Sequence, residues 1–177
     1  MENVVTTSAE RGQFEAPGEL LVQELLWIHN VLRGDLKIVQ QLAFDVLNGA
    51  PPEQIRENIR ALQTNSPLWK LRVNCLYYCR FVHSHHHHED WSLFPALRRS
   101  DPALNPVVDK LEADHRQISD YLDEVEAGAG RLATKDTVDG RQHLTNALHT
   151  LADHLLEHLA YEEKSISPTL RSWRGWP

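Results

Sequence analysis

Residues 85–95 of the chain read HHHHEDWSLFP, and residues 158–168 read HLAYEEKSISP. A His, a Glu four residues later, a second acidic residue, an aliphatic residue and a Pro recur at the same offsets in both segments. A His and a Glu four residues apart lie on one face of a helix, one turn above each other. Two such helices facing each other would bring two imidazoles and two carboxylates into one small volume. A pair of iron or manganese ions inside a helical bundle needs this kind of ligand set.

The sequence around these segments is helical in pattern. Apolar residues recur at three- and four-residue spacing, and no strand-like alternation is present. We expect long helices near 18–47, 67–98, 102–127 and 137–171, the third ended by Gly128-Ala129-Gly130, and a shorter helix near 52–63. Short connections between long helices predict an all-α, up-down-up-down four-helix bundle, with the short extra helix between the first and second long helices.

The bundle is expected to occupy residues 18–171, after a disordered N-terminal lead-in (1–17) and before a short aromatic tail (172–177). Three long helices show a stripe of residues predicted to face inward. These positions are Tyr78, Val82, His85, Glu89, Leu93 and Ala96; Val107, Leu111, His115, Ile118 and Leu122; and Leu144, Leu148, Leu151, Leu155, His158, Glu162 and Ile166.

The composition excludes several classes of protein. The chain has 177 residues, of which 41% are hydrophobic and 24% charged, as in an ordinary globular domain. Its net charge is −7 and its basic residues are spread singly, so no nucleic-acid surface is indicated. No apolar run is long enough for a membrane span. Residues 1–17 lack the apolar segment of a signal peptide and the chain has only two cysteines, so we expect a cytoplasmic protein, as a monomer or small homo-oligomer.

Two further histidines complete the candidate ligand set. His29 and His115 each lie near the middle of a predicted helix, at inward positions in the layer that holds the two His/Glu pairs. Burying four imidazoles and two carboxylates without a metal would be costly, because buried ionisable groups lose their hydration. We therefore predict that one set of residues binds metal: His29, His85, Glu89, His115, His158 and Glu162.

The run of four histidines allows two registers, because only one or two consecutive helical residues can face inward. His86 and Asp90 are also four residues apart, but the residue aligned with His86 in the second segment is Leu159. The comparison therefore favours the register of His85 and Glu89. His87 and His88 are expected to face solvent.

Five other polar side chains lie outside this ligand set. His154 lies one turn before His158, as an outer group of the site or a polar core contact. His83, His143 and His149 match no carboxylate pattern and are interpreted as structural. Tyr78 lies two turns before His85, and side chains on a helix lean toward its N-terminus, away from that histidine. Its role is therefore open between core packing, a capping or gating group above the metals, and a metal ligand.

At these residues the sequence resembles the hemerythrin-like, or HHE cation-binding, family. The matching pattern is His29, His85-x-x-x-Glu89, His115 and His158-x-x-x-Glu162, and the resemblance covers roughly residues 20–170. The resemblance implies a four-helix bundle with a non-haem di-iron centre bridged by two carboxylates. Oxygen-carrying members of the family use five histidines, an Asp and a Glu. The pattern here supplies four histidines and two glutamates, so we do not expect simple reversible oxygen carriage.

These observations predict a cofactor and a chemistry. Imidazole and carboxylate ligands suit iron, manganese or zinc, and we expect two iron ions with an oxo or hydroxo bridge. Two histidines per metal, two bridging carboxylates and that bridge leave an open position for a small molecule. We favour a peroxidase-like, catalase-like or nitric oxide-consuming oxidoreductase. The alternative is a protein that binds or senses oxygen or iron without turnover.

Overall fold

The computed structural model describes residues 16–48 and 67–177. Its long helices are α1 (Pro17–Leu47), α3 (Pro67–His88), α5 (Asn105–Thr134) and α6 (Val138–Ser172). The helix of α3 continues through a π-helical turn, η1 (Glu89–Leu93), into α4 (Phe94–Ser100), and a 3₁₀ turn, η2 (Pro102–Leu104), leads into α5. The described residues contain no strand.

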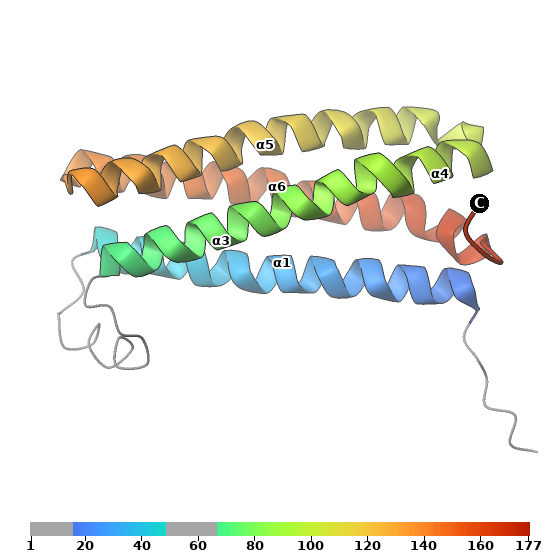
Figure 1. Cartoon of the computed structure of the whole chain (residues 1–177), viewed down its shortest axis with the longest axis horizontal. Helices are drawn as coiled ribbons and strands as arrows, with labels where there is room; N and C mark the ends of the chain where they lie inside the picture. The colour runs from blue at the N-terminus through green and yellow to red at the C-terminus, as the bar shows by residue number, and fades with distance from the viewer. Residues whose placement is uncertain (1–15, 49–66) are drawn as a thin grey trace, which may run out of the picture.

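The four long helices run alternately up and down and lie side by side (Figure 1). Helix α1 packs against α6 and α3, and α5 packs against the same two helices. The predicted all-α four-helix bundle is therefore confirmed. Residues 1–15 of the lead-in predicted at 1–17 lie outside the described residues, as does the expected short helix near 52–63, and α1 already begins at Pro17. No helix in the described part of the chain is both long and apolar enough to cross a membrane.

The core consists of two apolar clusters with a polar layer between them. One cluster contains Leu32, Val82, Leu122 and Leu155 among its residues, and the other contains Val22, Phe94, Leu111 and Ile166. Helices α1, α5 and α6, and the continuous segment from α3 to α4, each pass through one cluster, then a layer with buried histidine, then the other cluster. Apolar packing on both sides thus fixes the four helices where they carry their polar residues.

The π-helical turn changes the inward stripe of the second long helix. The N–H of Phe94 donates to the carbonyl oxygen of Glu89, five residues earlier, instead of the residue four earlier. Phe94 is therefore fully buried one wide turn after Glu89, whereas Leu93, predicted to face inward, is only half-buried. A single wide turn of this kind often lies at a functional site.

Two other sequence predictions were wrong in detail. Val108 is buried on α5 and Val107 is only partly buried, so the inward stripe there starts one residue later. Helix α5 does not end at Gly128 but continues to Thr134. A glycine costs a helix about 1 kcal/mol, but a Cβ at Gly128 would lie 3.3 Å from Cδ1 of Leu144. The missing side chain lets α5 approach α6 closely, and this packing outweighs the poor helix propensity.

Candidate metal centre

The polar layer brings together all six of the residues predicted to bind metal. His29 comes from α1, His115 from α5, and a His/Glu pair from each of the two repeated segments. All six are buried, with exposed fractions of 9% or less. One more residue joins them: His86, which is 5% exposed. Five imidazoles and two carboxylates therefore share the middle of the bundle.

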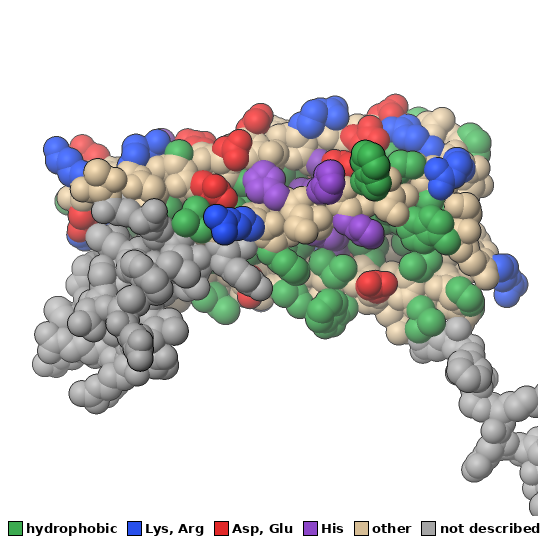
Figure 2. Space-filling model, in the orientation of Figure 1, with side chains coloured by type: hydrophobic (Ala, Val, Ile, Leu, Met, Phe, Trp, Pro, Cys, Tyr) green, Lys and Arg blue, Asp and Glu red, His purple; other side chains and the backbone are tan. Residues whose placement is uncertain are grey.

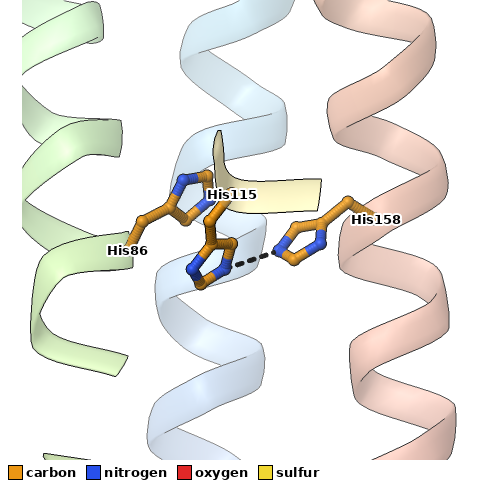
Figure 3. Close-up of side chains that lie close together, drawn as sticks. All are labelled: His86, His115 and His158. Atoms are coloured by element: carbon orange, nitrogen blue, oxygen red, sulfur yellow. Dashed lines mark hydrogen bonds between the residues drawn. The ribbon is translucent and has the colours of Figure 1, made fainter. Parts of the chain in front are cut away.

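Three of the imidazoles form one cluster (Figure 3). The rings of His86 and His115 stack with their centroids 3.9 Å apart. The rings of His115 and His158 meet edge to face, and their Nε2 atoms lie 3.1 Å apart. We call these residues the three-histidine cluster.

The second cluster consists of His29, His85, Glu89 and Glu162, and we call it the two-histidine cluster. Nε2 of His85 lies 3.2 Å from Oε1 of Glu89, and Nε2 of His29 lies 3.4 Å from Oε2 of Glu162. The same carboxylates also reach the three-histidine cluster. Oε2 of Glu89 lies 3.5 Å from Nε2 of His115, and Oε2 of Glu162 lies 3.7 Å from Nε2 of His158. Each carboxylate is therefore positioned between the two clusters.

A second pair of carboxylates orients two of the histidines. Nδ1 of His115 lies 2.8 Å from Asp90, and Nδ1 of His29 lies 2.8 Å from Glu163. Each acid directly follows one of the central glutamates in the chain. In each contact the Nδ1–H of the imidazole donates to the carboxylate, which leaves the lone pair of Nε2 facing the centre of the site. The acidic residue that recurs in both segments thus has a physical role.

This arrangement leaves acceptor atoms facing one another. With its proton on Nδ1, Nε2 of His29 can only accept, yet it faces Oε2 of Glu162, which is also an acceptor when that carboxylate is ionised. The side-chain atoms without a hydrogen-bond partner include His29 Nε2, His85 Nε2, His86 Nε2, both oxygens of Glu89 and both oxygens of Glu162. Two ligand atoms that are each about 2.1 Å from one metal and at cis or tetrahedral angles lie about 3.0–3.4 Å apart. The clusters therefore fit a metal cation site.

The pKa shifts of the buried histidines and glutamates also favour a metal site. Burial lowers the pKa of His85 to about 3 and that of His158 to about 4, so both imidazoles are neutral at neutral pH. Burial, followed by the charge of Glu162, raises the pKa of Glu89 well above its usual range. Neutral imidazoles are the form that binds metals. A bound cation would supply the positive charge that two ionised, buried carboxylates need.

Comparison with known families agrees with this geometry. The model of the hemerythrin HHE cation binding domain matches residues 20–170, which is most of the chain. The chain belongs to the hemerythrin HHE cation-binding family. Searches of curated proteins and of solved structures gave no match.

His86 is the residue of this layer that the sequence pattern did not include in the ligand set. The aligned residue in the second segment, Leu159, has no ligand atom. Leu159 is nevertheless fully buried, and His86 is buried as well. The second position of the repeated segment is therefore a core position in both copies, and the histidine that occupies it in one copy faces the site. The sequence pattern supplies four histidines, whereas the structure brings five together in the two clusters.

The remaining histidines of this hemerythrin-family chain lie outside the two clusters. His87 and His88 are exposed, as predicted, and histidine side chains come to the surface midway along the molecule (Figure 2). His154 is exposed and its Nε2 lies 3.2 Å from the hydroxyl of Tyr121, so it is not a core contact. His83 and His143 each lie near a carboxylate on α5.

Tyr78 is buried in the first apolar cluster, and its hydroxyl has no hydrogen-bond partner among the described residues. Burial, with smaller effects of Cys79 and Asp35, raises the pKa of this phenol far above its usual range. The neutral phenol is thus strongly favoured, which disfavours ligation as a phenolate. Its role as a capping or gating group stays a prediction.

Proposed function

We propose that this hemerythrin-family domain holds two iron ions and binds a small uncharged diatomic molecule, oxygen or nitric oxide, at one of them. In this proposal His86, His115 and His158 bind one iron, His29 and His85 bind the other, and Glu89 and Glu162 bridge the two. Manganese and zinc accept the same ligand types. The position of each carboxylate between the two clusters supports the bridging role.

The unequal number of histidines supports a single binding position. With two bridging carboxylates and a bridging oxo or hydroxo group, the metal held by three histidines would have six ligands and the metal held by two histidines would have five. When bound, an iron pair with one open position supplies reversible electron transfer to a small molecule. His29 and His85 would hold the metal that keeps this position.

A pocket of about 130 Å³ leads to the two-histidine cluster. This pocket is the main observation in support of a small-molecule binding position. It touches His85 and Glu89, and its wall includes the apolar side chains Leu25, Ile28 and Leu170. Trp176, in the short C-terminal tail, also lines it. Sites for drug-sized ligands take up roughly 300–1,000 Å³. A pocket this small and largely apolar suits a diatomic molecule better than a larger or charged substrate.

Metal analysis and optical titration test this proposal. We expect about two irons per chain, a charge-transfer band between the near ultraviolet and the visible, and a spectrum that changes when azide or nitric oxide is added. An oxygenated spectrum that reverts on degassing would establish reversible binding. Iron-loaded protein whose spectrum does not respond to either ligand would refute the proposed binding position.

Peroxide turnover is the second candidate, and two residues of the same pocket favour it. Glu24 and His88 line the pocket together with His85 and Glu89. A carboxylate and an imidazole at this place can hold and transfer protons next to a small ligand. Steady-state peroxide consumption by iron-loaded protein should then fall in His88→Asn. It should stay unchanged in His149→Asn, which alters an exposed histidine on α6. No turnover by the unmodified protein would exclude this candidate.

A further inference from the structure

The contacts of the site are related by an internal two-fold correspondence. Residues at the same position of the two repeated segments are equivalent, and His29 is equivalent to His115. Each contact in one half of the site then has an equivalent contact in the other half. The 2.8 Å contact of His115 with Asp90 corresponds to the 2.8 Å contact of His29 with Glu163. The 3.5 Å distance from His115 to Glu89 corresponds to 3.4 Å from His29 to Glu162.

The ring packing follows the same correspondence. His115 and His158 meet edge to face at a centroid distance of 4.7 Å, and His29 and His85 meet edge to face at 5.2 Å. Each cluster therefore contains one histidine from a single-histidine helix and the first histidine of one repeated segment.

The second position of the segments breaks the correspondence. His86 follows His85 and completes the three-histidine cluster, and its counterpart after His158 is Leu159. Both positions are buried and both lie in regular α-helix, since the π-helical turn begins only at Glu89. By the correspondence, Leu159 takes the place from which a third histidine would face the two-histidine cluster.

We propose that Leu159 determines the ligand specificity of this site by keeping one metal short of a third imidazole. This inference rests on the proposed function, because the vacant position is the one that the diatomic molecule would occupy. An apolar residue there does two things. It supplies no ligand atom, and it packs among the buried residues of the first apolar cluster. A role in core packing alone would require only an apolar residue of similar volume.

Two reciprocal variants test the inference. Leu159→His adds the missing imidazole, and His86→Leu removes its counterpart from the other cluster. Leu159→Met is the matched control, because it keeps an apolar side chain of similar volume. Each protein is measured in two ways: zinc titration of the metal-free form by calorimetry, and azide titration of the iron-loaded form by its optical spectrum.

The expected results differ in direction between the variants. Leu159→His should bind the weaker zinc ion about tenfold or more tightly, as loss of one supporting interaction costs roughly 10–100-fold in affinity. It should retain two irons and lose azide binding. His86→Leu should weaken the tighter zinc ion and raise the azide stoichiometry toward two per chain. Leu159→Met should match the unmodified protein in both titrations.

The outcomes separate this inference from the proposed function. Unmodified protein that binds no metal pair would refute both. If the metal pair is present but Leu159→His binds azide as the unmodified protein does, the inference about Leu159 is wrong and the proposed function stands. Should Leu159→His fail to fold, the His86→Leu variant decides: unchanged zinc affinity and azide stoichiometry would overturn the inference.

Discussion

Nδ1 of His29 lies 2.8 Å from Oε1 of Glu163 across the interface of α1 and α6, and Arg33 pairs with the same oxygen at 2.8 Å. Glu163 thus links the ring orientation of a proposed metal ligand to a surface cation. Outer carboxylates of this kind set the tautomer of a ligand histidine and typically contribute 10–100-fold to metal affinity. In the described part of the chain, no lysine or arginine pairs with Asp90 in the equivalent contact with His115.

Glu163→Ala should therefore weaken metal binding by roughly 10–100-fold. Glu163→Gln should lose less, because the amide oxygen still accepts the Nδ1–H of His29. The measurement is competition with a chelator of known affinity. Asp153→Ala removes an exposed acid from the same helix and is the matched control. Equal losses in Glu163→Ala and Asp153→Ala would show that only net charge matters.

Removing the metal should destabilise the bundle. The unpartnered buried atoms of the site each cost about 1–3 kcal/mol, and a ligand present at 100 times its Kd adds about 2.7 kcal/mol to the folded state. For a chain of this size each kcal/mol shifts Tm by about 2–4 °C. We expect chelation to lower Tm by about 5–10 °C or more in thermal unfolding followed by circular dichroism. A metal-free protein with the same Tm as the loaded one would contradict this prediction.

The central carboxylates should matter more than single histidines. Glu89 and Glu162 each lie between the two clusters, so replacing either one by Ala should release both ions. His29→Ala should loosen mainly one ion, because this side chain belongs to only one cluster. His87→Ala, a change to an exposed neighbour, should leave the metal content unchanged. Metal analysis after gel filtration checks all three expectations, and a metal-free His87→Ala protein would show that the assigned register is wrong.

The metal-free protein should lose stability as the pH falls. His85 and His158 have folded-state pKa values of about 3 and 4, whereas an unfolded histidine titrates near 6.5. The unfolded chain therefore binds more protons below pH 6.5, and the free energy of unfolding falls between about pH 6.5 and 4. Each histidine contributes roughly 1 kcal/mol per pH unit in this window.

Urea unfolding of chelated protein at pH 7 and pH 5 measures this slope. His85→Asn should reduce it, because the substituted side chain does not titrate. His149→Asn changes an exposed histidine on α6 and should leave the slope unaltered. Stability that is constant or higher at pH 5 would be the opposite of the expected result.

Tyr78→Phe removes a buried hydroxyl that has no hydrogen-bond partner among the described residues. No bond is lost, so the free energy of unfolding should stay the same or rise by up to about 1 kcal/mol. In Tyr121→Phe, by contrast, Gln117 loses an acceptor at 2.7 Å. Urea unfolding and the optical spectrum of iron-loaded Tyr78→Phe are the measurements. A changed spectrum would show that Tyr78 acts on the metals.

The fold could be predicted from the sequence because helix formation and burial leave a local pattern. Apolar periodicity placed α1 and α6 to within about a residue, and Thr137 caps α6 with its side-chain oxygen. The two His/Glu pairs were predicted for the same reason, since a four-residue spacing alone puts both side chains on one helical face. The continuation of α5 beyond Gly128 could not be predicted, since it depends on the approach of a different helix.

The sequence by itself determined the bundle, the two repeated segments and the six residues that share one layer. Only the tertiary structure decided that His86 belongs with His115 and His158, and that Asp90 and Glu163 contact histidines of other helices. Each of these contacts joins helices that are remote in the chain, so their distances depend on how the helices pack. Neighbouring positions on one helix differ by about 100° in direction, and only the packed partners determine which neighbour faces the site. The sequence thus shows that His86 and Leu159 differ at equivalent positions, but only the packing shows that both positions are buried beside the site.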